Sequence, residues 1–237
     1  MPRLARLVVP GMPLHITQRG VNRAAIFLDD EDRLHFRTVL HDALATHAID
    51  LHAYVLMDNH VHLLATPRDS PSLGRAMRLS GQHYVRYFNH RHGRIGTLWQ
   101  GRFKSSLVQE DRHLLQVIRY IELNPVRAAM VDAPEAHRWS SVHGHFGAQD
   151  PLLTRHPLVI ATGRTDEERS AWHRAWLKEA IDDEELTNIR RYIAQERAFG
   201  NPRFQRMVEQ TLGQHAAVRA NGRPTKTKTG TEGVKAN

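Results

Sequence analysis

The 237-residue chain is 41% hydrophobic and 24% charged, a composition that can fold around one or two cores. It contains no cysteine, which excludes disulfide scaffolds, cysteine-ligated metal centres and thiol catalysis. No segment reaches the roughly 18 consecutive apolar residues of a membrane span, so we expect a cytoplasmic protein.

The formal net charge of +8 is concentrated in two segments. Residues 84–104 contain five Lys or Arg and no acid, and residues 218–237 contain five Lys or Arg and one acid. A local positive field favours a binding surface for a polyanion over a general effect on solubility. The second segment is almost free of apolar residues, so we expect it to be a disordered basic tail.

The first 130 residues predict a regular alternation of strands and helices. In chain order the expected elements are a strand at 14–19, a helix at 29–47, strands at 51–56 and 60–66 joined by a tight turn, a helix at 71–88, a strand at 103–109 and a helix at 110–124. Pro125 is expected to close the last helix. This order predicts an α+β fold, a ferredoxin-like βαββαβ domain with an antiparallel sheet, two helices on one face and a C-terminal helical extension.

We expect four parts in the chain: the domain at 1–130, an irregular connector packed on it at 131–183, a C-terminal helical element at 184–217 and the tail at 218–237. The helical element should hold two short helices broken by Gly200-Asn201-Pro202. Its basic side chains are a candidate second contact with nucleic acid: Arg190, Arg191, Arg197, Arg203 and Arg206.

The triplet His60-Val61-His62 lies in an apolar strand, where alternation places both imidazoles on one face and Val61 on the other. Two imidazoles at this spacing can coordinate one divalent cation. The chain has 17 histidines, so one such triplet is expected by chance, and two others fall in segments that we expect to be loops, at 90–92 and 143–145. We expect most of the remaining histidines to be surface positions.

Tyr120 and Asn124 are separated by four residues on the last predicted helix of the domain, which places them on one face. They flank the apolar stripe of that helix and can face the edge of the sheet and a metal there. A tyrosine packed at a helix boundary, with Asn124 as a cap, is the structural alternative. Glu122 points away from Tyr120, and we expect it to be solvated or salt-bridged.

Aromatic and basic side chains interleave in residues 84–104. Rings can stack on unpaired bases while cations follow the backbone, which is typical of single-strand binding. Val85, Tyr84 and Phe88 can belong to the helix core instead, and we expect this for at least one or two of these rings. The candidate DNA-binding residues of this segment are Arg86, Arg91, Arg94, Trp99, Arg102 and Lys104.

Several ordered motifs resemble the REP-associated tyrosine transposases, single-strand-specific HUH transposases related to the insertion-sequence-200 type. These motifs are Met57-Asp58-Asn59-His60-Val61-His62-Leu63-Leu64, Tyr84-Val85-Arg86-Tyr87-Phe88-Asn89, Gly96-Thr97-Leu98-Trp99-Gln100-Gly101-Arg102-Phe103-Lys104-Ser105-Ser106 and Arg119-Tyr120-Ile121-Glu122-Leu123-Asn124-Pro125-Val126-Arg127-Ala128. Gln18-Arg19-Gly20 and Arg138-Trp139-Ser140-Ser141 also match, and we add Arg19 to the DNA-binding set. The resemblance covers about residues 5–146 and resumes at 189–212. One departure is Asp58, where the family usually has proline; it lies in the turn, outside the chemistry.

The resemblance implies that residues 1–130 form an HUH tyrosine transposase domain. It implies that His60, His62 and Asn124 hold Mg²⁺ or Mn²⁺ and that Tyr120 attacks phosphorus to form a 5′-phosphotyrosine link. The implied partner is a single-stranded DNA hairpin from a repetitive extragenic palindrome, which is cut beside its foot and rejoined.

Three hypotheses follow for the function. The favoured one is a cleaving and rejoining enzyme of the nucleoid, acting as a monomer or homodimer. The second is a non-catalytic protein that binds DNA or RNA hairpins, a domesticated transposase acting as a regulator. The third is a metal-dependent hydrolase that uses water, with Tyr120 structural. Only the first needs His60, His62, Tyr120 and Asn124 together.

Overall fold

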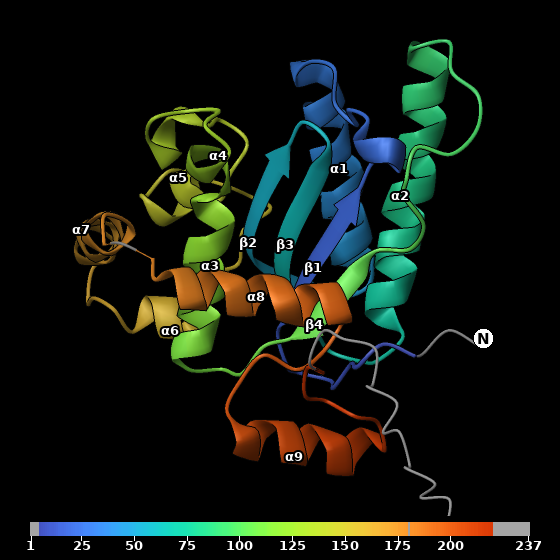
Figure 1. Ribbon diagram of the computed structural model, residues 1–237. Helices are drawn as coiled ribbons and strands as arrows, with labels where there is room; N and C mark the ends of the chain where they lie inside the picture. The colour runs from blue at the N-terminus through green and yellow to red at the C-terminus, as the bar shows by residue number, and fades with distance from the viewer. Residues whose placement is uncertain (1–4, 180, 220–237) are drawn as a thin grey trace, which may run out of the picture.

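The computed structural model describes residues 5–179 and 181–219 of the chain (Figure 1). The predicted basic tail at 218–237 therefore lies outside the described residues, apart from its first two positions. No helix within the described ranges is long and apolar enough to cross a membrane.

A four-stranded antiparallel sheet forms the centre of the molecule, in the order β2-β3-β1-β4. Its strands are β1 (Leu14–Arg19), β2 (Ile49–Met57), β3 (His60–Pro67) and β4 (Lys104–Leu107). Asp58 and Asn59 make the predicted tight turn between β2 and β3. With two helices between the strands, this topology confirms the ferredoxin-like fold.

Two helices, α1 (Asp30–Thr46) and α2 (Ser72–Arg91), cover one face of the sheet (Figure 1). The side chain of Asp29 caps α1 by accepting a hydrogen bond from the backbone N–H of Asp32. Alternate strand residues, including Ile16 and Val61, point to this side and are fully buried in the core beneath the helices. The short 3-10 turn η1 (Val21–Arg23) leads from β1 towards α1.

The opposite face of the sheet packs against α3 (Arg112–Glu122), which begins at the capping side chain of Asp111. Val55 and Leu64 of the sheet meet Val117 and Ile121 of this helix in a second apolar cluster. The helix ends at Glu122 with Leu123 as its C-cap, and a further turn, α4 (Asn124–Arg127), follows with Pro125 inside it. Proline is tolerated there because the first turn of a helix needs no N–H donor at that position.

Residues 131–183 are more regular than the sequence suggested. They contain η2 (Pro134–Ala136), α5 (Val142–His145), α6 (Pro157–Ile160) and α7 (Asp166–Leu177). A capping box between Thr165 and Glu168 starts α7, a signal that the expectation of an irregular connector overlooked.

The C-terminal element consists of α8 (Asp183–Gln195) and α9 (Pro202–Leu212). In Figure 1, α8 crosses the sheet at the β4 end, and contacts to β4, β1 and α3 hold it there. Phe199, between the two helices, forms a parallel bridge with Val108 just beyond β4. The C-terminal element therefore closes one side of the space between the sheet and α3.

Candidate active site

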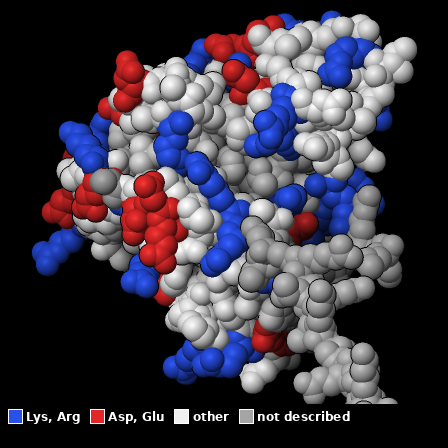
Figure 2. All heavy atoms as spheres, in the orientation of Figure 1, with Lys and Arg blue, Asp and Glu red and all other residues white. Residues whose placement is uncertain are grey.

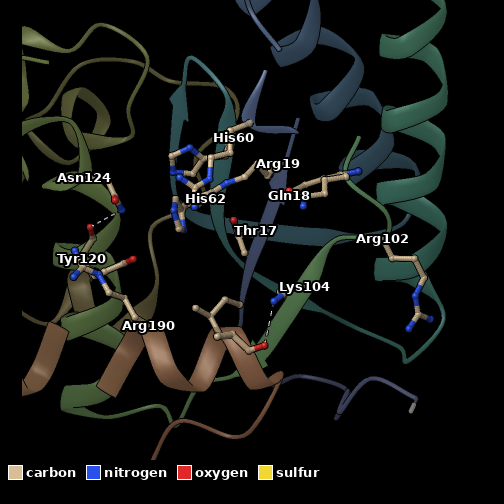
Figure 3. Close-up of a pocket in the computed structure, with 14 residues that line it drawn as sticks. Thr17, Gln18, Arg19, His60, His62, Arg102, Lys104, Tyr120, Asn124 and Arg190 are labelled. Atoms are coloured by element: carbon tan, nitrogen blue, oxygen red, sulfur yellow. Dashed lines mark hydrogen bonds between the residues drawn. The ribbon is translucent and has the colours of Figure 1, made fainter. Parts of the chain in front are cut away.

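A cavity of about 640 Å³ lies between the sheet, α3 and α8 (Figure 3). Its walls come from β1, β3, β4, the end of α3, α4 and α8. The lining residues include eight of the polar positions discussed below: Arg19, His60, His62, Arg102, Lys104, Tyr120, Asn124 and Arg190. The cavity therefore brings together residues that lie up to 171 positions apart in the chain.

The two strand histidines face the cavity on the α3 side of the sheet, as alternation predicted. Their ring centroids lie 5.0 Å apart. Nδ1 of His60 lies 2.6 Å from Oδ1 of Asn59, and Nδ1 of His62 lies 2.9 Å from Nε2 of His15. Because both rings use Nδ1 for a hydrogen bond, Nε2 is the atom of each ring that can hold a ligand.

Burial keeps these imidazoles neutral. It lowers the pKa of His60 to about 4, with a further contribution from Arg19, and it lowers the pKa of His62 well below its ordinary value. The neighbouring His15, 1% exposed, has its pKa lowered to about 3 by burial alone. Neutral imidazole is the form that binds metals.

Tyr120 approaches the two histidines from α3. Its ring lies 5.6 Å from the ring of His62, edge on, and at the same distance from His15. Nδ2 of Asn124 donates to the backbone carbonyl of Tyr120 at 2.9 Å, which leaves Oδ1 as the free atom of the amide. The structure thus places Tyr120, Asn124 and both histidines around one cavity.

Arg127 packs against the outer face of this tyrosine. Its guanidinium carbon lies 4.3 Å from the centroid of the Tyr120 ring, and Nη2 donates to the carbonyl of Tyr120 at 2.9 Å. Tyr120, Asn124 and Arg127 are spaced i, i+4, i+7, so helical periodicity already places them on one face. That spacing was the signal by which Arg127 could have been found in the sequence.

Cations surround the cavity, although only two come from the basic segment 84–104. These are Arg102 and Lys104; Arg19, Arg23 and Arg190 come from elsewhere in the chain. Lys104 also donates to the carbonyl of Ala194 on α8 at 3.2 Å. In Figure 2, Lys and Arg atoms border the hollow on this face, while acidic atoms gather where α8 begins.

The other predicted DNA-binding residues of the segment lie away from the cavity. Arg91 is held by the carboxylates of Asp29, Glu31 and Asp32. Arg86 lines a different hollow, between α1 and α2 on the other side of the sheet.

Arg94 and Trp99 also lie elsewhere. The guanidinium of Arg94 stacks over Phe88 at 5.4 Å. Trp99 is 8% exposed and packs in the core beside Tyr84, so its ring offers no open face to a base. This burial corrects the expectation of an exposed stacking surface: the rings of the segment are mostly core residues.

Of the two forms expected for Glu122 the structure shows the salt-bridged one, because the residue is fully buried and pairs with two histidines. Its carboxylate accepts from Nδ1 of His145 at 2.7 Å, from Nε2 of His173 at 2.6 Å and from the hydroxyl of Ser141 at 2.7 Å. Burial alone would raise the pKa of Glu122, but the two imidazoles and their hydrogen bonds hold it well below its ordinary value.

Glu122, His145 and His173 are residue types that could hold a metal ion at this spacing. A tetrahedral ion bound at about 2.0–2.1 Å would hold its ligand atoms about 3.3 Å apart. The shorter contacts to Glu122 are those of hydrogen bonds. The outer ring nitrogens of both histidines are also buried without a partner in the part of the chain that the structure describes, whereas a ligating histidine normally donates from that position. The cluster therefore ties α3 to α5 and α7 as a hydrogen-bonded network.

Seven of the 17 histidines are buried. The buried ones among the described residues are His15, His52, His62, His137, His145, His156 and His173. Several form hydrogen bonds between segments that are far apart in the sequence, such as His52 with Thr154 and Thr66. The other histidines are partly or fully exposed, as we expected of most of them. Periodicity did not single out the buried ones, because it cannot reveal a partner a hundred residues away.

The family model described as "Transposase IS200 like" matches residues 8–124, from just before β1 to the first residue of α4. The fold and this match together define the protein as a transposase. Residues 8–124 belong to the IS200-like transposase family. No curated protein has a significantly similar sequence.

Two solved structures resemble the chain. One is a REP-associated tyrosine transposase bound to a REP hairpin, with a TM-score of 0.51 and 18% identity, covering 66% of this chain and 93% of that one. At this identity the match supports the ferredoxin-like fold. The other is a transposase candidate from Deinococcus radiodurans R1, with a TM-score of 0.36 and 25% identity, covering 51% of this chain and 96% of that one.

Proposed function

We propose that this transposase cuts and rejoins single-stranded DNA at REP-type palindromic hairpins, with Tyr120 as nucleophile. The observation that carries the proposal is the approach of Tyr120 to within 5.6 Å of His62, ring to ring, in a cavity lined by cations. A tyrosine with only a packing role has no need of two neutral imidazoles, an amide and several cations around it.

The donor set in the cavity fits a divalent cation. His60 and His62 can offer Nε2, and Asn124 can offer Oδ1, because their other polar atoms are already hydrogen-bonded. Mg²⁺ usually prefers oxygen ligands, so Mn²⁺, which also accepts imidazole, suits this mixed set at least as well. Such an ion supplies Lewis-acid stabilisation of the charge that develops on a phosphate oxygen.

The residues of the chain would carry out the bond-making and proton-transfer steps. Tyr120 forms the bond to phosphorus while the bond from phosphorus to the 3′ oxygen breaks, and the proton that Tyr120 loses balances the one that the 3′-OH gains. The product is a 5′-phosphotyrosine with a free 3′-OH. The phosphodiester energy is retained in this link, so the reverse attack by the 3′-OH needs no nucleotide cofactor.

The cations of the cavity give the DNA contact. Arg19, Arg102, Lys104 and Arg190 converge from three strands or loops and from α8, so they can contact successive phosphates of an unpaired strand. The hairpin specificity rests on the family resemblance and on the REP hairpin bound by the solved relative. The sequence-based candidates Arg86, Arg91, Arg94 and Trp99 have no place in the proposal.

The test is to incubate a labelled single-stranded REP hairpin, including its unpaired foot, with the protein and Mn²⁺ and to run a denaturing protein gel. We expect a covalent adduct that Tyr120→Phe abolishes. Tyr87→Phe is the matched control, because Tyr87 lies on α2 outside the cavity. Cleavage without an adduct would favour the water-using hydrolase, and a mobility shift without cleavage would favour the regulator.

The metal set is tested by a separate substitution. His60→Ala should abolish adduct formation and leave hairpin affinity largely unchanged, since His60 contributes a ligand atom and no positive charge. Loss of hairpin binding together with cleavage would mean that His60 is structural.

A further inference from the structure

The surroundings of Arg127 are unusual for a residue that only caps a helix. Its Nη2 atom donates to the carbonyl of Tyr120, and a basic residue at the C-terminal end of a helix is favourable in that role. Capping accounts for Nη2 but gives no role to the other two guanidinium nitrogens of Arg127. Nε and Nη1 are both buried, and neither has a hydrogen-bond partner among residues 5–179 and 181–219.

The charge of Arg127 is also uncompensated. Burial lowers the pKa of Arg127, Tyr120 opposes this effect and Arg190 adds to it, and no carboxylate takes part. No salt bridge forms to Arg127 within the described part of the chain. Most other buried or half-buried arginines here have an acid partner, such as Arg33 with Asp58 and Arg119 with Glu185.

The group closest to this unpaired cation is the ring of Tyr120, 4.3 Å from the guanidinium carbon. A cation over an aromatic face is attracted by the ring quadrupole, and the attraction grows when the ring carries negative charge. Tyrosine oxygen becomes partly anionic when it attacks phosphorus and again when it leaves during rejoining. A fixed cation over the face of the ring that carries this oxygen is a preorganised electrostatic stabiliser of both steps.

We propose that Arg127 is a catalytic residue whose fixed positive charge stabilises the Tyr120 oxygen as it becomes the nucleophile and, in rejoining, the leaving group. This inference rests on the proposed function of Tyr120. In cleavage the phosphorus–oxygen bond to Tyr120 forms and the bond to the 3′ oxygen breaks; in rejoining both changes are reversed and the phenolic oxygen regains its proton from solvent. Arg127 stays beside the ring throughout and neither gains nor loses a proton.

The decisive measurement is the rate of adduct formation in a single turnover, compared with hairpin affinity measured without metal. Arg127→Gln should lower the rate about 100-fold and change affinity less than threefold. Arg127→Lys, which keeps a charge but not the planar stacking group, should retain about a tenth of the rate. Arg138→Gln is the matched control, because Arg138 also stacks on a ring, Trp139, but lies outside the cavity.

Chemical rescue separates this role from a structural one. Guanidinium added at low millimolar concentration should raise the adduct rate of Arg127→Ala and leave the wild type unchanged. A wild-type rate in Arg127→Gln would overturn the proposal, as would parallel loss of folding, hairpin affinity and rate without rescue. If the wild type itself forms no Tyr120-dependent adduct, the proposed function fails first, and that outcome is distinct from an active Arg127→Gln variant.

Discussion

His15 shows how a side chain outside the proposed metal ligands can orient one of them. Its Nε2 atom lies 2.9 Å from Nδ1 of His62, with the two rings stacked at 5.1 Å. Burial makes both rings neutral, so one of them donates and the other accepts. This bond fixes the orientation of His62 and directs its Nε2 to the cavity, as partners behind metal ligands commonly do.

We therefore expect His15→Ala to weaken Mn²⁺ binding about 10- to 100-fold. His15→Gln, whose amide can still bond to Nδ1 of His62, should recover part of that loss. Isothermal titration of Mn²⁺ into the DNA-free protein measures the effect. His41→Ala is the comparison, because His41 lies on the surface of α1, and equal affinities for all these proteins would contradict the assigned role.

At the scale of elements, α3 is held by segments that follow it in the chain by up to 51 residues. Glu122 lies two positions from both Tyr120 and Asn124, and its carboxylate is held from α5, from α7 and from the residue before α5. Because the helix also packs its apolar stripe on the sheet, it is fixed from two sides. The residues at 131–183 thus support the helix that carries the proposed nucleophile.

Removing this carboxylate should be costly. Glu122→Ala leaves two buried histidine donors and a serine hydroxyl without an acceptor, so we expect the free energy of unfolding to fall by about 3–5 kcal/mol. Urea denaturation measures the change. Glu135→Ala, on an exposed turn, should change stability by no more than about 0.5 kcal/mol, and a similar small change at Glu122 would show that the network is not stabilising.

At the scale of the whole molecule, buried neutral histidines make the fold sensitive to acid. Burial lowers the pKa of His15 to about 3 and that of His52 to about 4, whereas both titrate near 6.5 when unfolded. Between these values the unfolded chain binds more protons than the folded one. Stability is therefore retained above about pH 6.5 and is lost as the pH falls towards 4.

At pH 5 each of these two histidines should reduce the free energy of unfolding by about 2 kcal/mol relative to pH 7. Denaturation curves of metal-free protein across this range measure the slope. His52→Gln, which can keep the hydrogen bond to Thr154, should flatten the slope by about one proton. An unchanged slope in this variant would mean that His52 is already protonated in the folded state.

The distribution of charge over the molecule also predicts how binding responds to salt. If the cavity cations contact DNA phosphates, the logarithm of affinity should fall linearly with the logarithm of salt concentration. Arg102→Gln should reduce that slope by about one, whereas Arg86→Gln, on the other side of the sheet, should leave it unchanged. Fluorescence anisotropy with a labelled hairpin provides the measurement, and a lower slope in Arg86→Gln alone would move the contact surface to α2.

Much of the fold could be read from local patterns. The alternation of residues 60–66 and the turn at Asp58 and Asn59 predicted a hairpin that the sheet contains, and α1 begins and ends within one residue of its predicted bounds. The placement of Tyr120 beside His62 followed from helical and strand periodicity combined with the family motifs. These features are set within a few residues, so the sequence carries them directly.

Other features arise from contacts that no local pattern encodes. Trp99 and Arg91 belong to a stretch rich in basic and aromatic residues. In the structure, Trp99 is buried in the core and Arg91 is ion-paired with an acidic cluster on α1. His173 and Glu122 are 51 residues apart and become partners only when α7 packs near α3. Their partners depend on how the elements pack against one another, and residue type alone does not predict that.

The sequence by itself determined the transposase family, the βαββαβ order and the shared face of His60 and His62 on their strand, because these follow from motif spacing and side-chain periodicity. Only the tertiary structure decided which cations line the cavity, that His15 is hydrogen-bonded to His62, and that Arg127 packs on the ring of Tyr120 with no acid partner among the described residues. The physical reason is that charge and hydrogen bonding act through space, so their partners are fixed only when the sheet, α3 and α8 are packed together.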